Sequence, residues 1–226
     1  MRSSWPRTTA LQLTAEVNLC ECLKTWAAEN RPMEEIGLAA LDKALTQRPD
    51  WAAMLKLRFW HYFKHGRYQE ALLVSDTLLA KEPDDAAVLT DRVIVLRSMG
   101  QVAQALALVP AMLKALDNEA TGSVAAAVHF AHGDDAEAAR LARNALVRMT
   151  RAQRAVSEPG SVALVLVAAE SRAGHLERAR AAFKDFQDVV PKAQTVGQIK
   201  AWLQPSWMAP GGDAFWDALK RAGAGG

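Results

Sequence analysis

Apolar and polar side chains alternate with the period of an α-helix over residues 139–156, ARLARNALVRMTRAQRAV. At about 100° per residue, the arginines of this segment fall within an arc of about 140° on one side of such a helix. They are Arg140, Arg143, Arg148, Arg151 and Arg154. Small and apolar residues, among them Ala142, Ala145 and Leu146, fall on the opposite side. The pattern predicts one long amphipathic helix with an arginine face, which the following SEPGS would end.

Shorter helices joined by glycine turns are predicted along the rest of the chain. Residues 60–73, WHYFKHGRYQEALL, have the pattern of a helix, a turn at Gly66 and a second helix. Gly66 and Gly100 are 34 residues apart, Gly133 follows after 33, and Gly174 after a further 41. Glycine suits these positions because a residue just beyond the last helical turn prefers a left-handed conformation. An alanine, which lets two helices approach closely, follows each glycine by five residues: Ala71, Ala105, Ala138 and Ala179. Prolines at Pro49, Pro83 and Pro191 close three of these repeats.

A period of 34 residues in a helical chain resembles that of the tetratricopeptide-repeat (TPR) family. In the repeat that begins near residue 52, the matching residues are Tyr62, Gly66, Tyr68, Ala71 and Pro83. The resemblance implies an all-α fold, a right-handed superhelix of about five antiparallel helix pairs with a C-terminal helical cap. The expected boundaries are an N-terminal extension at 1–15, the solenoid at 16–192 and the cap at 193–226. We assign the seven extra residues between the last two turn glycines to the lengthened second helix of the fourth repeat.

The C-terminal segment resembles the end of TPR domains attached to bacterial class III adenylate cyclases and winged-helix transcriptional regulators. The matching elements are Ile199-Lys200-Ala201-Trp202, Pro205, Phe215 and residues 219–223. This resemblance implies the regulatory arm of a bacterial signalling or transcription protein. No cyclase or DNA-binding domain is present in the sequence, so a stand-alone arm and a piece of a longer protein both stay open.

Partner binding in the family uses the concave groove that the first helix of each repeat lines. The expected partner-binding residues are Trp26, Lys56, Trp60, Phe63, Lys64, Thr90, Arg97 and Phe130, with Ile94, Ser123, Leu164 and Arg172 in the same register. Exposed aromatic rings are typical anchors because they bury large areas at a small entropic cost. Alternatively, these rings pack against neighbouring repeats. We predict a protein–protein interaction module that binds a peptide or partner domain; the alternative is a secretion-type chaperone that holds an extended client.

The arginine face allows three interpretations: a solvated surface, a contact with an acidic protein partner, or a contact with nucleic-acid phosphates. Nucleic acid is the least favoured, because no aromatic residues alternate with these arginines for base stacking. The net charge of +2 also gives no strong overall field towards nucleic acid or an anionic membrane.

Catalytic and metal chemistry have little support in the sequence. His61 and His65 have the spacing of two metal ligands on a helix, but a tyrosine replaces the glutamate that would follow the first histidine in a zincin motif. No phosphate-binding loop or nucleophile motif is present. We therefore expect no enzymatic activity, metal, cofactor or small-molecule substrate. The chain also lacks an apolar run long enough for a membrane span and a signal-peptide pattern at its start, which favours the cytoplasm. The oligomeric state stays open.

Overall fold

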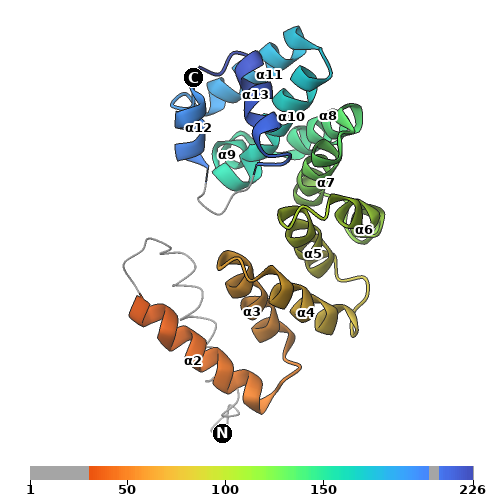
Figure 1. Cartoon of the computed structure of the whole chain (residues 1–226), viewed down its shortest axis with the longest axis vertical. Helices are drawn as coiled ribbons and strands as arrows, with labels where there is room; N and C mark the ends of the chain where they lie inside the picture. The colour runs from red at the N-terminus through yellow and green to blue at the C-terminus, as the bar shows by residue number, and fades with distance from the viewer. Residues whose placement is uncertain (1–30, 204–208, 226) are drawn as a thin grey trace, which may run out of the picture. The chain divides into compact units, whose positions relative to one another are not determined.

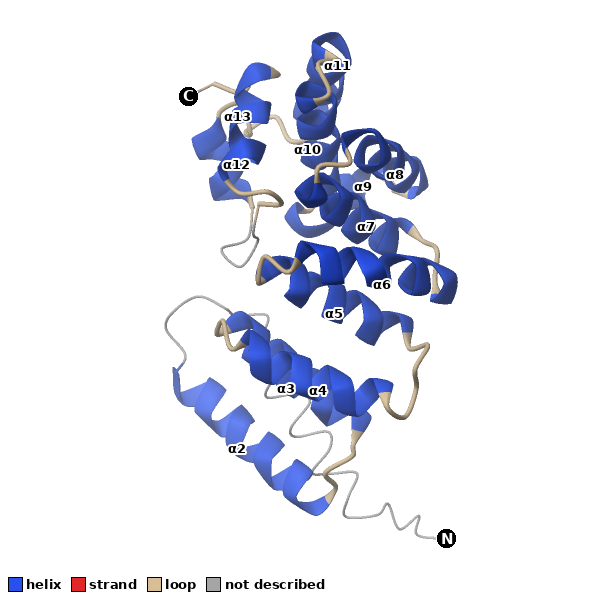
Figure 2. Ribbon diagram, turned by 45° about the vertical axis from the view of Figure 1, so that its right-hand side comes forward, coloured by secondary structure: helices blue, strands red, loops and turns tan. Residues whose placement is uncertain are grey.

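The structure is a computed structural model that describes residues 31–203 and 209–225 (Figure 1). The chain divides into two compact units, Met1–Pro83 and Asp84–Gly226, called here the N-terminal and C-terminal units. The regular elements drawn in both units are α-helices joined by short loops (Figure 2).

The described part of the N-terminal unit consists of α2 (Arg31–Gln47), α3 (Ala52–Lys64) and α4 (Tyr68–Leu79). Helices α3 and α4 pack together as a pair, and α2 packs against α3. Their core contains the fully buried side chains of Leu41 and Met54. Helix α2 lies where the sequence predicts the second helix of the first repeat.

The C-terminal unit contains three further helix pairs and a C-terminal segment. The pairs are α5 (Ala86–Ser98) with α6 (Val102–Ala115), α7 (Glu119–His132) with α8 (Asp135–Arg148), and α10 (Ser157–Arg172) with α11 (Leu176–Val189). The short α9 (Arg151–Ala155) lies between α8 and α10, and the chain ends with α12 (Val196–Trp202) and α13 (Asp213–Arg221). Together with α3 and α4, the described residues therefore contain four complete pairs.

The turn glycines and the alanines that follow them have the predicted roles. Gly66, Gly100, Gly133 and Gly174 join the two helices of a pair with φ of 70°, 74°, 106° and 83°. An L side chain would be strained in this left-handed conformation. The alanines at the equivalent position of each second helix are fully buried: Ala71, Ala105, Ala138 and Ala179. Their small side chains allow the paired helices to approach closely.

The prediction of one lengthened helix over residues 139–156 is wrong. Helix α8 ends at Arg148, and Met149 is extended, with φ of −84° and ψ of 139°. Thr150 then begins α9 with a capping box: its side chain accepts a hydrogen bond from the backbone N–H of Gln153, whose side chain accepts one from the N–H of Thr150. The inserted residues therefore form a separate short helix, and SEPGS begins α10 instead of ending the preceding helix.

The C-terminal segment folds back onto the first helices of two pairs. Helix α13 packs against α10. Its Phe215 ring meets Phe130 of α7 edge to face, with ring centroids 5.8 Å apart. Trp202 of α12 meets Phe186 of α11 in the same way at 5.3 Å. The apolar end of the last pair is thus buried, as the side chains of Leu164, Val167, Phe183 and Phe186 show.

Candidate functional site: the outer faces of the first helices

Four of the predicted partner-binding residues share one face of α3. Lys56, Trp60 and Lys64 are spaced by four residues, and Phe63 is three residues from Trp60, so their side chains lie along the same side of the helix. Trp60 is only partly buried, and so are both lysines. The structure therefore brings an accessible indole and two cationic side chains together on this face.

The Trp60 ring is held by its neighbours on the same helix. It meets the Phe63 ring edge to face at 5.5 Å and the Phe59 ring at 5.8 Å. Phe59 is 2% exposed and Phe63 is 9% exposed, so both rings belong to the core of the helix pair. Trp60 thus rests on a rigid aromatic base while part of its own surface stays open. Such an arrangement limits the rotamer entropy that the indole would lose on binding a partner.

The equivalent face of α5 carries Thr90, Ile94 and Arg97, all partly exposed. The Thr90 hydroxyl donates to the carbonyl oxygen of Ala86 at 2.6 Å, which fixes its orientation on the helix. Surrounding side chains desolvate the Arg97 guanidinium and lower the pKa of this group to about 10. Arg97 therefore keeps its charge at neutral pH, in a site where water screens that charge poorly.

Two of the corresponding residues of α7 and α10 lie in the core, and a third, Arg172, packs on one of them. Phe130 and Leu164 are fully buried. The guanidinium of Arg172 lies 3.8 Å from the centre of the Phe130 ring and donates to the Phe130 carbonyl oxygen. Its Nε also contacts both carboxylate oxygens of Asp135, at 2.7 and 2.8 Å. We expected Phe130 in an open groove, but it packs beneath Phe215, a contact that the repeat register alone does not reveal.

Another predicted groove residue, Ser123, is partly exposed. The hydroxyl of Ser123 on α7 donates to the carbonyl oxygen of Glu119 at 2.6 Å, within its own helix. Trp26 lies outside the described residues.

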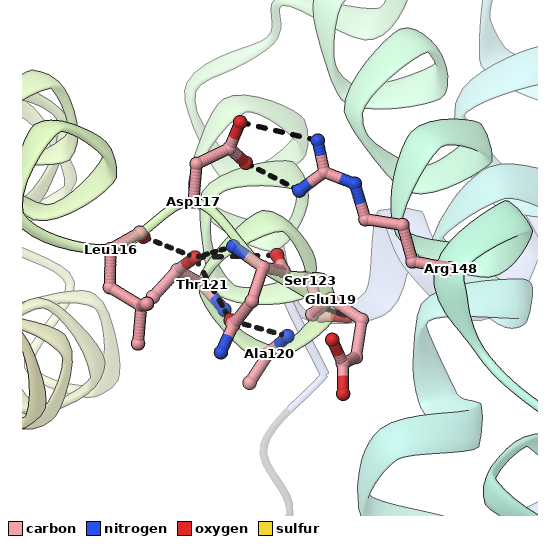
Figure 3. A network of polar contacts seen from close by, with 8 residues as sticks. Leu116, Asp117, Glu119, Ala120, Thr121, Ser123 and Arg148 are labelled. Atoms are coloured by element: carbon pink, nitrogen blue, oxygen red, sulfur yellow. Dashed lines mark hydrogen bonds and ion pairs between the residues drawn. The ribbon is translucent and has the colours of Figure 1, made fainter.

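The five arginines of residues 139–156 do not form one helical face, because α8 and α9 are separate helices. Arg140 pairs with Glu137 on its own helix, and Arg143 pairs with Glu170 of α10. Figure 3 shows the guanidinium of Arg148 facing Asp117, with bonds of 2.6 and 3.2 Å to the two carboxylate oxygens.

The two arginines of α9 also make internal contacts. Arg151 donates to the carbonyl oxygen of Asp188 at 2.8 Å, and Arg154 donates to that of Leu146. All five guanidinium groups therefore have contacts within the protein, and most of their partners lie on another helix. The sequence could not reveal these partners, because Asp117, Glu170 and Asp188 are all more than 25 residues from the arginine they contact.

The two histidine pairs lie at the ends of α3 and α7. The His61 and His65 rings lie 4.4 Å apart, centre to centre, at the end of α3. His129 and His132 share one carboxylate oxygen of Asp134, at 3.2 and 3.0 Å, and the bond from His132 is the main cause of the lowered pKa of Asp134. Within residues 31–203 and 209–225, no group of three His, Cys, Asp or Glu side chains could hold a metal ion.

Comparison with known proteins agrees with this architecture. No family model matches the sequence, and no curated protein matches it. Among solved structures, a thermophilic TPR protein of Thermus thermophilus is similar, with a TM-score of 0.59 and 19% identity over 79% of this chain and 92% of that chain. In the described residues, no helix is long and apolar enough to cross a membrane. The helix pairs, their glycine turns and this structural match together show that the chain has the tetratricopeptide-repeat fold.

Proposed function

We propose that this protein binds a segment of a partner protein on the face of α3 that carries Trp60. The observation that supports the proposal best is the partly exposed indole, which rests on Phe63 between Lys56 and Lys64. Tryptophan dominates many interfaces because its ring buries a large area when a partner covers it.

The chemistry of this face indicates the kind of segment that it would bind. Lys56 and Lys64 lie one helical turn to either side of Trp60, so an apolar contact is flanked by two positive charges. A complementary partner would present a large apolar side chain next to acidic residues. Thr90, Ile94 and Arg97 of α5 supply a second surface of the same character, with one cation and one apolar side chain. Trp26 stays a predicted contact, whereas the buried Phe130 is not part of the proposed surface.

In its biological context, we propose a non-catalytic regulatory arm of a bacterial signalling or transcription protein in the cytoplasm. This part of the proposal rests on the resemblance of the C-terminal segment, including Ile199, Trp202 and Phe215, to TPR domains attached to such proteins. The alternative is a chaperone for an extended client. A client would be protected from proteolysis along its bound segment, whereas a regulated output domain would bind as a folded unit.

The test is to purify the partners of the wild type and of a Trp60→Ala variant from the native organism and then measure the affinity of the purified partner for both. Loss of the indole is expected to weaken binding by about 2 kcal/mol, roughly thirtyfold. A Lys56→Glu/Lys64→Glu variant should weaken binding most at low salt. Leu73→Ala is the matched control, because Leu73 is an exposed apolar residue of α4 that does not belong to the Trp60 face.

Thermal melting separates a binding role from a packing role. Phe59→Ala, beside Trp60 in the core, should destabilise the fold by about 3 kcal/mol or more. If Trp60→Ala destabilises the fold equally and leaves binding per folded molecule unchanged, Trp60 is a structural residue and the proposal is wrong.

A further inference from the structure

A cavity of about 410 Å³ lies within the C-terminal unit between α8 and α11, on the second helices of two consecutive pairs. Helix α10, which packs against both, forms its floor with Ala163, Leu166 and Glu170. Arg154 of the inserted helix α9 completes the lining. This volume is within the range of small-molecule sites, which are mostly apolar with a few polar groups.

The lining is polarised along the helices. On α11 it runs from Arg178, near the start of the helix, through Ala182 to Phe186 and Val189 near its end. Helix α10 is antiparallel to α11, because the two are joined by a tight turn, so Glu170 lies at the same end as Arg178. Arg178 and Glu170 therefore lie at the end of the cavity that faces the turn, called here the polar end. The end that faces α9, called here the apolar end, is lined mainly by apolar side chains, with Arg154 beside them.

The balance of charge at the polar end favours an anion. Glu170 is almost fully buried, with 3% of its side chain exposed, and its carboxylate already contacts Arg143 and His175. Arg178, by contrast, is exposed and has no acidic partner among the described residues. Asp185, the other acidic lining residue, lies two helical turns further along α11, about 10 Å away. The polar end thus offers one guanidinium whose charge is not balanced by a carboxylate.

The geometry points to a binding site for a small carboxylate with an apolar body, such as a medium-chain fatty acid. The carboxylate would pair with Arg178, next to Arg143, and the apolar body would cover Leu166, Ala182 and Phe186. Val147, which is 82% exposed, would be covered at the apolar end. The ligand undergoes no reaction in this proposal. The site lies on other helices than the Trp60 face and does not depend on the function proposed for that face.

Calorimetric titration of the full chain with sodium decanoate, below its micelle concentration, tests the site. We expect saturable binding of decanoate, weaker binding of the neutral 1-decanol, and no binding of acetate, which lacks the apolar body. Arg178→Gln should weaken decanoate binding about three- to fivefold and leave 1-decanol binding unchanged, because it removes a single exposed ion pair. Arg180→Gln is the matched control: Arg180 lies on the same helix, pairs with Glu177 and does not line the cavity.

Two further variants locate the apolar body. Ala182→Trp fills the cavity, and Val147→Asp places a carboxylate at the apolar end; both should weaken decanoate and 1-decanol binding by about tenfold or more. Val147 is so exposed that its replacement should leave the fold intact, which melting curves will check. Absence of saturable decanoate binding would overturn the proposal. So would equal binding to the wild type and to a folded Val147→Asp variant, which would indicate adventitious adsorption elsewhere.

Discussion

The first helices of the four described pairs have two different surroundings. The position six residues before the turn glycine is Trp60 on α3 and Ile94 on α5, but Ala127 on α7 and Ala168 on α10. Trp60, Ile94 and Ala127 are partly exposed, whereas Ala168 is fully buried on the helix against which α13 packs. A small side chain allows another helix to approach closely, whereas an indole keeps another helix at a greater distance. The small side chain of Ala168 thus lies on a face that the chain covers itself, whereas the large side chains of Trp60 and Ile94 lie on faces that stay partly accessible.

The contact of α13 with the α7 and α10 faces should contribute most to the stability of the C-terminal unit. Phe215→Ala removes a fully buried ring that packs on Phe130 and leaves a cavity, so the expected loss is about 3 to 5 kcal/mol in the free energy of unfolding. Denaturant unfolding measures this quantity. Lys220→Ala, at an exposed position of the same helix, should change it by less than about 0.5 kcal/mol. Similar stability of the two variants would show that α13 does not serve as a cap.

The helix pairs could be predicted from the sequence because their determinants are local. A turn glycine such as Gly66 and an alanine such as Ala71 act through the backbone and the nearest neighbouring helix, so each leaves a mark at a fixed spacing. The break at Met149 had a local signal too: Thr150 and Gln153 have the spacing of a capping box. The arginine periodicity concealed it, because helical spacing continues across a single extended residue.

The surroundings of the candidate site could not be predicted in the same way. That Phe215 covers Phe130 depends on a contact between residues 85 positions apart, which no period in the sequence encodes. The cavity beside α11 likewise depends on how α8, α9 and α11 pack around α10. By contrast, the face formed by Lys56, Trp60 and Lys64 lies within a single helix, so its composition could be predicted from spacing alone.

Replacing Ala168 by a larger residue tests directly whether a small side chain is needed on the face that α13 covers. Ala168→Leu should force α10 and its neighbours apart and destabilise the C-terminal unit by about 1 to 3 kcal/mol, because the site is already fully packed. Faster hydrogen exchange in α13 would show that this helix is the element displaced. Ile94→Leu at the equivalent position of α5 should have a much smaller effect, since Ile94 is partly exposed. Equal losses for the two variants would mean that the size of this residue does not distinguish the two faces.

An ion pair that recurs in both units should have the smallest effect. Asp50 pairs with Lys81, and Asp117 pairs with Arg148. In each pair the aspartate follows the second helix of one repeat. The cation is 31 residues later in the sequence, at or just beyond the end of the second helix of the next repeat. The hydrogen bond from the cation is the main cause of the lowered pKa of each aspartate. A lowered pKa in the folded state means that the pair stabilises the fold above the ordinary aspartate pKa of 3.8 and that this stabilisation is lost as the pH falls below that value.

The difference between arginine and lysine predicts which of the two ion pairs contributes more to stability. Arginine contacts both oxygens of Asp117, whereas lysine is a point charge, so Asp117→Asn should lower the melting temperature more than Asp50→Asn at neutral pH. The melting temperatures of both variants should approach that of the wild type as the pH falls from about 5 to about 2. Asp185→Asn is the control, because it removes no ion pair among the described residues; its melting temperature should differ little from that of the wild type over the whole range. If Asp117→Asn differs from the wild type by the same amount at both ends of this acid range, the ion pair contributes nothing measurable to stability, and the bonds drawn in Figure 3 only orient two exposed side chains.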